Sequence, residues 1–193
     1  MLIAGVDEAG RGPLAGPVTV AAVILPPGGI TGCAVRLTDS KKLSVLQRES
    51  LEAAICAQAV CYSVVHVPVE QIDRMNILAA TLHGMRQAVE KLAKLPGKVL
   101  VDGNRVPELS MPVEAVVGGD AKIAAVSAAS ILAKNARDRL MCQLHQQFPQ
   151  YGFDRHKGYG TRLHMEKLAE FGPCPAHRRS FAPVRRFLQA RLF

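Results

Sequence analysis

The feature that most constrains this chain is an Asp-Glu pair followed directly by a glycine-rich loop, in the stretch VDEAGRGPLAGP at residues 6–17. Residues 1–6 are apolar and predict a short strand, so we expect Asp7 and Glu8 where that strand ends. Adjacent carboxylates repel each other and are costly to hold together in a fold. A divalent cation removes that cost, because Mg²⁺ and Mn²⁺ prefer hard oxygen ligands.

The loop after this pair adds groups that suit a phosphate. Gly10 and Gly12 leave backbone N–H groups accessible, and Arg11 places a guanidinium between them. Metal ligands and phosphate ligands in one short segment indicate phosphodiester chemistry. The alternative is that Asp7 and Glu8 form a solvated turn that the glycines shape, and further carboxylates are needed to decide between the two.

Two further strand-like runs supply such carboxylates. The run at 98–101 leads into Asp102, and the run at 113–117 leads into Gly-Gly-Asp with Asp120. An Asp beside a Gly is often only a turn former, but carboxylates follow a strand-like run three times here. Ligands of open α/β sheets collect at this end of the strands, and four carboxylates suit a two-metal phosphodiesterase. The candidate catalytic residues and metal ligands are Asp7, Glu8, Asp102 and Asp120.

Strand and helix patterns alternate along the chain, which predicts an α/β fold with a mixed sheet whose opening strands pair as a meander. Strands are expected at 1–6, 18–25, 60–67, 99–101 and 113–117. Helices are expected at 43–59, 77–95, 121–148, 161–171 and 181–193. Ser44 is the expected N-cap of the first helix.

Composition narrows the class of partner. With 193 residues, 49% of them hydrophobic, the chain can form one sizeable domain with a short appendage. Its net charge of +8 favours polyanions such as nucleic acid. Much of the excess lies in the C-terminal part, at Arg137, Arg139, Arg155, Lys157, Arg162, Lys167, Arg178, Arg179, Arg185, Arg186 and Arg191.

The sequence gives no support for a membrane protein, a zinc protein or a secreted protein. No apolar run approaches the roughly 20 residues that span a membrane. The five cysteines form no CxxC pair, which argues against a zinc site and indicates free thiols in a reducing compartment. The strand and motif begin at once, so we expect no cleaved leader and a cytoplasmic protein.

The motifs together resemble those of bacterial type 2 ribonucleases H, the ribonuclease HII family. The matching stretches are GVDEAGRGPLAGPV at 5–18, DSKKLS at 39–44, VDGN at 101–104, GGDAK at 118–122, SAASILAKNARD at 127–138, HKGYGT at 156–161 and HRRSF at 177–181. One departure is Asn135, where the family more often has an aliphatic residue, and we expect it on a helix surface or packing face.

The resemblance implies a ribonuclease-H-like catalytic core at 1–149, a mixed sheet flanked by helices. A small, basic, helical C-terminal segment at 150–193 would contribute to substrate binding. The implied activity is hydrolysis of the RNA strand of RNA/DNA hybrids, and cutting at single ribonucleotides in duplex DNA, with two Mg²⁺ or Mn²⁺ ions. Products would carry 5′-phosphate and 3′-hydroxyl ends.

Cutting RNA while sparing DNA requires a reader of the 2′-hydroxyl. The resemblance implies that Gly10, Arg11 and Gly12 contact this group and nearby phosphates. Tyr159, between two glycines, is the second expected reader, against the alternative of a plain turn residue. Lys41 is a candidate phosphate ligand, and a solvated helix cap is the alternative.

Other residues of these motifs have less specific roles. Ser127 and Ser130 share a helix face and are expected to allow close packing on the sheet. Lys134 and Arg137 face either the substrate or solvent. Packing or phosphate contact is expected of the three remaining candidates, His156, His164 and His177, rather than metal binding.

Two other functions stay open at this point: a metal-dependent DNA nuclease of the same broad fold, and a non-catalytic hybrid-binding module. The first gives no reason for the Gly10–Gly12 loop and Tyr159. The second fits poorly, because carboxylates at strand ends hinder binding to a polyanion unless metal fills them. We expect a monomer that binds RNA/DNA hybrids and ribonucleotide-containing DNA and no membrane.

Overall fold

A computed structural model describes residues 1–32, 37, 40 and 43–189 of the chain. Its centre is a five-stranded sheet in the order β3-β2-β1-β4-β5. The strands are β1 (Ile3–Ala9), β2 (Val18–Ile24), β3 (Cys61–Val67), β4 (Lys98–Asp102) and β5 (Val113–Val116). The first three strands pair antiparallel, and β4 and β5 continue the sheet parallel to β1. The predicted mixed sheet and opening meander are confirmed.

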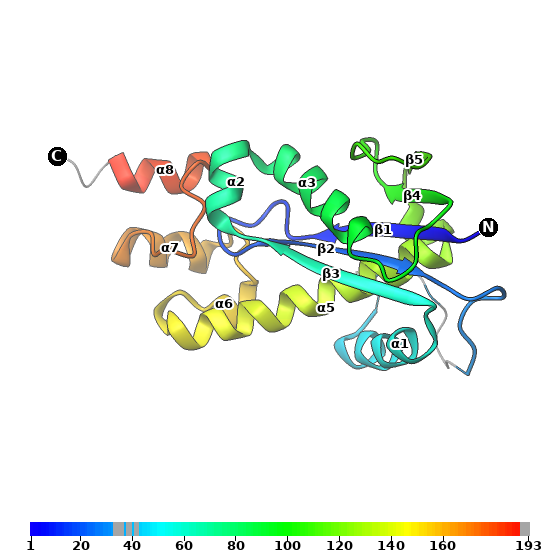
Figure 1. Cartoon of the computed structure of the whole chain (residues 1–193). Coiled ribbons are helices and arrows are strands. Elements are labelled where there is room, and N and C mark those ends of the chain that lie inside the picture. Colours follow the sequence, from blue (N-terminus) through cyan, green and yellow to red (C-terminus); the bar gives the residue numbers. More distant parts are fainter. Residues whose placement is uncertain (33–36, 38–39, 41–42, 190–193) are drawn as a thin grey trace.

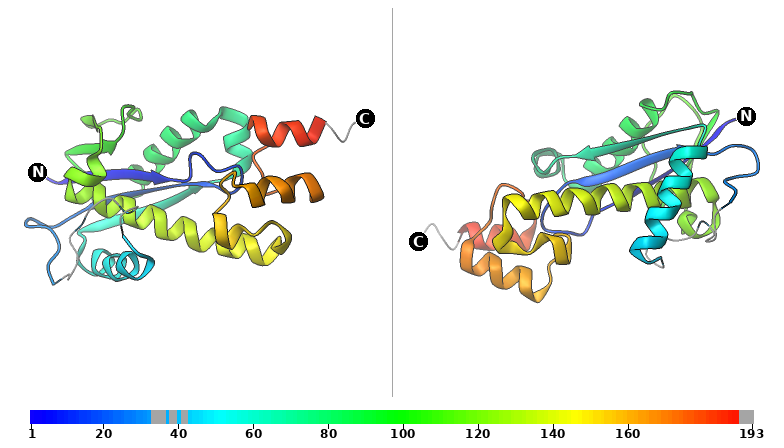
Figure 2. Two further views of the ribbon diagram at one scale, coloured as in Figure 1. Left: turned by 180° about the vertical axis from the view of Figure 1, so that it is seen from behind. Right: turned by 90° about the horizontal axis from the view of Figure 1, so that it is seen from below.

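Helices cover both faces of this sheet (Figures 1 and 2). They are α1 (Val45–Gln58), α2 (Val69–Met75), α3 (Ile77–Glu90), α4 (Gly119–Lys122), α5 (Ala124–Gln147), α6 (Phe153–His156), α7 (Arg162–Phe171) and α8 (Ala182–Gln189). On one face α3 buries Met85 and Ala88 against Val6 and other apolar residues of the sheet. The opposite face holds α5 with α1 beside it, in a second cluster that includes Ile131.

The contact between β1 and α5 is a backbone contact. A Cβ atom added at Gly5 would lie 2.2 Å from the carbonyl carbon of Ala125, so no other residue fits there without moving the helix. This close approach places the first turns of α5 directly beneath the strand that carries Asp7.

Two predicted boundaries are wrong, and each has a physical reason. The strand β1 does not end before Asp7 but runs on to Ala9, because the chain there continues to pair with β2. The predicted helix at 77–95 ends at Glu90. Pro96 disfavours helical backbone in the residue before it, and the N–H of Gly97 donates to the Leu2 carbonyl, 2.9 Å away.

The long helix predicted within 121–148 is confirmed as α5, and the short helix α4 precedes it. Ile123 is extended, with φ −124° and ψ 115°, and separates α4 from α5. The hydroxyl of Ser127 donates to the carbonyl oxygen of Asp120 across the break, which gives this buried carbonyl a partner. The Ser44 N-cap of α1 is confirmed, because its side chain accepts from the Gln47 N–H.

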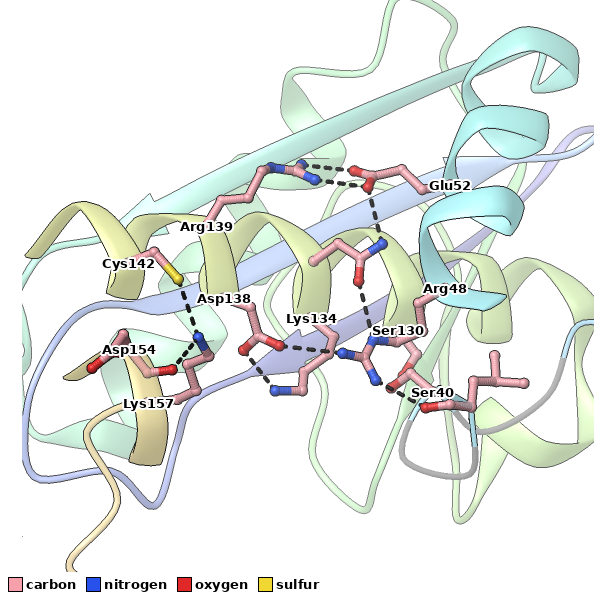
Figure 3. Close-up of polar contacts among 12 residues, drawn as sticks. Ser40, Arg48, Glu52, Ser130, Lys134, Asp138, Arg139, Cys142, Asp154 and Lys157 are labelled. Atoms are coloured by element: carbon pink, nitrogen blue, oxygen red, sulfur yellow. Dashed lines mark hydrogen bonds and ion pairs between the residues drawn. The ribbon is translucent and has the colours of Figure 1, made fainter. Parts of the chain in front are cut away.

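A polar network joins α1 to α5 on the outside of the sheet (Figure 3). Arg139 donates to both carboxylate oxygens of Glu52, each at 2.7 Å. Asn135 is buried between the helices, where it donates to Glu52 at 2.9 Å and accepts from Arg48 at 3.1 Å. The residue that departs from the family pattern therefore lies on a packing face, as expected.

The C-terminal segment packs at one end of the molecule, where α7 and α8 lie (Figure 1). The helix α5 ends at Gln147, and a short 3₁₀ turn follows at Pro149–Tyr151. One apolar cluster joins Ala15 and Met141 to Tyr151 and Phe153 across this point. The division into 1–149 and 150–193 stays a prediction, and the last part of the predicted C-terminal helix lies outside the described residues.

Two predictions from composition can be compared with the described part of the chain. None of its helices combines the length and apolarity needed to cross a bilayer. Cys56, Cys61, Cys142 and Cys174 are free thiols, while Cys33 lies outside the described residues.

Candidate active site

Three of the four predicted carboxylates come together at one end of the sheet. Asp7 lies on β1, Asp102 ends the parallel neighbour β4, and Asp120 lies on α4. One carboxylate oxygen from each side chain can be chosen so that all three atoms lie within 4.8 Å of one another. Asp7 and Asp102 meet because parallel neighbouring strands end at the same edge of a sheet.

The electrostatics of this cluster favour a cation. Asp7 is 5% exposed. Its pKa is raised well above the usual range, first by burial and then by the negative charges of Glu8 and Asp102. Hydrogen bonds from the Glu8 N–H, at 2.7 Å, and from the Ser130 hydroxyl oppose this rise by stabilising the carboxylate. An ionised Asp7 therefore needs a positive charge beside it, and oxygen ligands suit Mg²⁺ or Mn²⁺.

The backbone fixes the other two carboxylates. The N–H of Gly119 donates to Oδ1 of Asp102 at 2.8 Å. Gly118 has φ +67°, the left-handed conformation that glycine favours, and it turns the chain from β5 into the α4 turn that carries Asp120. The Ser127 hydroxyl holds the backbone of Asp120 from α5.

Glu8, the fourth predicted ligand, lies outside the three-carboxylate cluster. Successive residues of a strand project to opposite sides, so Glu8 cannot share the position of Asp7. Its side chain still lines the same cleft, and its Oε1 lies 3.4 Å from Nη1 of Arg11.

A cleft of about 270 Å³ opens above these residues. Its walls are Asp7, Glu8, Ala9, Gly10, Arg11, Gly12, Ser40, Asp102, Ser130, Lys134, Arg137 and Tyr159. The predicted sugar readers, Gly10 to Gly12 and Tyr159, therefore share one cavity with the carboxylates. Tyr159 is 47% exposed, which leaves its ring accessible to a ligand. Lys41 lies outside the described residues, and its predicted phosphate contact stays a prediction.

Ser130 has more contact with the site than its sequence pattern indicated. Its hydroxyl lies 2.8 Å from that of Ser40, beside the cleft (Figure 3), and it also bonds Asp7. The helical spacing from Ser127 correctly predicted a shared face. Nothing in the local pattern predicted that Ser130 would reach the carboxylate, because this depends on how α5 crosses β1.

Two buried arginines hold the glycine-rich loop from below. The guanidinium of Arg178 donates to the carbonyl oxygens of Gly10, Arg11 and Gly16, at 2.6, 2.9 and 3.0 Å. The guanidinium of Arg137 donates to the carbonyls of Ala15 and Pro17, at 3.2 and 3.1 Å. These donors satisfy carbonyl groups that a tight loop cannot pair with itself.

Of the two alternatives for Arg137, exposure to solvent is wrong, because its side chain is buried while it lines the cleft. Arg137 is 1% exposed and Arg178 is fully buried. Burial lowers the pKa of Arg137 to about 10 and that of Arg178 to about 9, so both remain charged at neutral pH. No local pattern distinguishes them from surface arginines, since Arg178 and Gly10 are 168 residues apart.

Arg137 and Arg178, which together clamp the loop, also determine which backbone groups face the cleft. Since the loop's carbonyls are bound from below, peptide N–H groups are left for the cleft. In the part of the chain that the structure describes, no protein acceptor is recorded for the N–H of Gly10, Arg11 or Gly12. Gly10 has φ +94°, and a Cβ there would meet Nε of Arg137 at 1.9 Å, so this position requires glycine.

Other basic residues of the C-terminal part are paired with acids. Arg139 pairs with Glu52, Arg162 with Glu166, and Lys167 with Glu170. Among the described residues of this part, the exposed arginines that remain for a polyanion are Arg155, Arg179, Arg185 and Arg186, while Arg191 lies outside the described range. His156, His164 and His177 are buried, as the packing interpretation predicted.

A mixed sheet with carboxylates gathered at the ends of β1 and β4 defines a nuclease-type fold of the ribonuclease H class. The crystal structure of ribonuclease H2 from Pyrococcus horikoshii OT3 is similar, with a TM-score of 0.82 and 30% identity, covering 98% of each chain. The family model for ribonuclease HII matches residues 4–184. The ribonuclease HII of Acidovorax sp. (strain JS42) is 58% identical over 190 residues, which is 98% of this chain and 89% of that protein.

A second relative, from Burkholderia mallei (strain SAVP1), is 57% identical over 184 residues, covering 95% of this chain and 85% of that ribonuclease HII. The chain belongs to the ribonuclease HII family. It is an endoribonuclease of a family that acts on RNA/DNA hybrids and depends on divalent metal.

Proposed function

We propose that this protein hydrolyses the RNA strand of RNA/DNA hybrids and cuts at single ribonucleotides in duplex DNA by a two-metal-ion mechanism. The observation that carries the proposal is the convergence of Asp7, Asp102 and Asp120 within 4.8 Å, in a cleft that the Gly10–Gly12 loop also lines. The first feature suits metal and the second suits a phosphodiester.

The positions of the carboxylates suggest which of the two ions each would bind. Asp7 lies between Asp102 and Glu8, whose charges both act on it. It would therefore contribute to both ion positions, with Asp102 and Asp120 on one side and Glu8 on the other. When bound, two Mg²⁺ or Mn²⁺ ions activate the attacking water and neutralise charge on the leaving 3′-oxygen. The products are then a 5′-phosphate and a 3′-hydroxyl.

The chain's own residues orient these ligands before metal binds. The Gly119 N–H occupies one lone pair of Asp102, and the Ser130 hydroxyl occupies one of Asp7. Each leaves the remaining carboxylate lone pairs for a cation. Orientation by second partners of this kind strengthens metal sites generally.

Sugar recognition falls to the loop and to Tyr159. The N–H groups of Gly10 to Gly12 can bind a 2′-hydroxyl or a phosphate oxygen, because these residues line the cleft and the structure gives their N–H groups no acceptor within the described part of the chain. The Tyr159 ring lies on the same side, with its Cε1 3.7 Å from where a Cβ of Gly12 would be. It can stack on the sugar of the next nucleotide while its hydroxyl bonds the 2′-hydroxyl. Arg155, Arg179, Arg185 and Arg186 remain for phosphate contacts.

The alternatives are weaker. A DNA nuclease has no use for a loop and a tyrosine that read a 2′-hydroxyl, and membership in an enzyme family argues against a non-catalytic binding module. The predictions that the protein is a monomer and is cytoplasmic stay as predictions.

Product mapping on a duplex with one ribonucleotide tests the proposal. Strand-labelled substrate should be cut once, at the ribonucleotide, only with Mg²⁺ or Mn²⁺, and give 3′-hydroxyl and 5′-phosphate ends. An all-DNA duplex of the same sequence and the Asp102→Asn variant are the controls. Cleavage of the all-DNA duplex, or full activity in excess chelator, would contradict the proposal.

A further inference from the structure

A chain of hydrogen bonds runs under Tyr159 through two buried histidines. Nδ1 of His164 lies 2.9 Å from the carbonyl oxygen of Tyr159. Nε2 of His164 lies 2.9 Å from Nε2 of His177, and Nδ1 of His177 lies 3.0 Å from the backbone nitrogen of Cys174. Neither the carboxylate cluster nor the clamped loop explains this arrangement.

The partners fix which ring nitrogens carry protons. A carbonyl oxygen only accepts, so Nδ1 of His164 is the donor to Tyr159. A neutral imidazole has one donor and one acceptor, so Nε2 of His164 accepts from Nε2 of His177. Nδ1 of His177 then accepts from the N–H of Cys174, which completes the chain without an unpaired atom.

This arrangement needs both rings neutral. A second proton on His164 would make two N–H groups face each other across 2.9 Å, and a second proton on His177 would face the N–H of Cys174 across 3.0 Å. Burial lowers the pKa of His164 to about 4 and that of His177 to about 3, so the neutral forms hold at physiological pH.

A third histidine fixes the other side of the same turn. The ring of His156 stacks on that of His164, with centroids 4.4 Å apart. Its Nδ1 accepts from the N–H of Gly158 at 3.2 Å, and its Nε2 donates to the Tyr151 carbonyl at 2.8 Å. Imidazoles therefore bind the N–H of Gly158 and the carbonyl oxygen of Tyr159 within this one turn.

The turn is also tied to the glycine-rich loop. The N–H of Leu14 donates to the Gly158 carbonyl at 2.8 Å. Gly158 has φ +83°, and a Cβ there would meet the Ala15 carbonyl oxygen at 2.5 Å. The backbone of Tyr159 is thus fixed relative to the glycine-rich loop, which lines the cleft beside it.

Three histidines and Cys174 also raise the alternative of a metal site. The ring nitrogens of His156, His164 and His177 all have hydrogen-bond partners in the protein. Across the described ranges, the ligand atoms that converge on one point belong to the aspartate cluster. The geometry therefore fits a positioning device better than a metal centre.

We propose that His164 and His177 are positioning residues: a neutral hydrogen-bond relay that holds the Tyr159 carbonyl and so directs its ring toward the sugar of the substrate. The inference rests on the proposed role of Tyr159 as a reader. It assigns His164 and His177 an effect on ribonucleotide recognition although neither lines the cleft.

Two substitutions of His164 separate its contact with the Tyr159 carbonyl from its contact with His177. His164→Asn keeps a donor near the Nδ1 position, toward Tyr159, and loses the acceptor toward His177. His164→Gln keeps a polar group toward His177 and loses the donor to Tyr159. Both should be measured in the wild type and in a Tyr159→Ala background, on the single-ribonucleotide duplex, with Mg²⁺ titrated in each case.

We expect His164→Gln to lower kcat/KM about tenfold, within the range set by losing one base-type stack. His164→Asn should lose less, and the Mg²⁺ dependence should not shift in either. In the Tyr159→Ala background, His164→Gln should cause no further loss. Undiminished cleavage by His164→Gln beside a defective Tyr159→Ala would overturn the relay and leave the proposed function standing. A full additional loss in that background would overturn it too, because the histidine would then act through the fold generally.

A Tyr159→Ala variant with wild-type kcat/KM would instead remove the reader role, and with it the basis of the relay. One measurement needs no variant. Nitrogen NMR of the wild-type rings should show the Nδ1–H form for His164 and the Nε2–H form for His177. The opposite forms, or a charged ring at neutral pH, would overturn the proposal.

Discussion

The cleft has two walls that are stabilised in different ways: an acidic wall, and a wall formed by the glycine-rich loop and Tyr159. On the acidic wall, Asp7, Asp102 and Asp120 face one another within 4.8 Å, and their mutual repulsion is only partly offset by hydrogen bonds from the protein. Beneath the loop and Tyr159, two arginines and a histidine donate to backbone carbonyl groups. The acidic wall is therefore completed by a ligand, whereas the other wall is preorganised by the fold.

This difference separates activity from stability. Removing a charge from the acidic wall should abolish chemistry without harming the fold. Removing a group from beneath the loop should first destabilise the protein, and cleavage should fall as a consequence. Each of the following experiments tests this difference between the two walls.

The largest effect is expected for Asp7→Asn or Asp102→Asn. Cleavage should fall to background even at saturating Mg²⁺, because an amide is a poor ligand for a hard cation. The midpoint of thermal unfolding in metal-free buffer should stay the same or rise, since a repulsive charge is gone. Cleavage rates and unfolding curves of the same samples check this. Near-normal turnover, or a marked fall in stability, would remove the contrast between the walls.

Next comes Arg178→Met, which leaves the carbonyls of Gly10, Arg11 and Gly16 without their donor. Each buried carbonyl without a partner costs roughly 1–3 kcal/mol, so the free energy of unfolding should fall by about 3 kcal/mol or more. Urea unfolding measures it. The neighbouring Arg179→Met is the matched control, because Arg179 is exposed and should change stability by no more than about 0.5 kcal/mol. Equal effects of the two would show that the clamp does not hold the loop.

A smaller effect, on activity alone, is expected at Tyr159. Tyr159→Ala should lower kcat/KM about tenfold to a hundredfold, because a lost stack is worth roughly 1–3 kcal/mol. Tyr159→Phe should lose much less, since it keeps the ring. Stability should be unchanged in both, because the side chain is largely exposed. Rescue of Tyr159→Ala by extra Mg²⁺ would instead show that Tyr159 acts on metal binding at the acidic wall.

The smallest effect concerns pH. His164 and His177 have folded pKa values of about 4 and about 3, below the unfolded value near 6.5. Between these values the unfolded state binds more protons, so stability is present above pH 6.5 and is lost as the pH falls toward 4. Each histidine contributes at most about 1.4 kcal/mol per pH unit. His164→Asn should therefore reduce the slope of unfolding free energy against pH between 4.5 and 6. An unchanged slope would show that the ring is not buried in its neutral form.

The sequence predicted what depends on local pattern. Apolar runs located the five strands, and because two of them are parallel, the Asp residues at their ends meet as expected. The glycines and the Tyr of the two turns marked a shared cleft. Lys41 lies outside the described residues, so its predicted phosphate contact stays a prediction.

Long-range contacts could not be predicted in this way. Arg137 reaches Ala15 across 122 residues, and Arg178 reaches Arg11 across 167 residues. Both looked like part of a basic surface, because charge alone does not show which arginines turn inward. One general signal was available: a tight glycine- and proline-rich loop leaves carbonyl groups unpaired, so some donor from elsewhere must reach them.

The backbone contact at Gly5 has a further consequence for the alignment of the two elements that meet in the site. From Ala125 to Ser130 the helix α5 advances about 7.5 Å, and from Gly5 to Asp7 the strand advances about 6.7 Å. The two lengths nearly match, so the contact at Gly5 brings the Ser130 hydroxyl level with the Asp7 carboxylate, to which it bonds. A side chain at Gly5 would therefore shift α5 along β1 and move Ser130 out of line with Asp7, a proposed metal ligand that the new side chain would not touch.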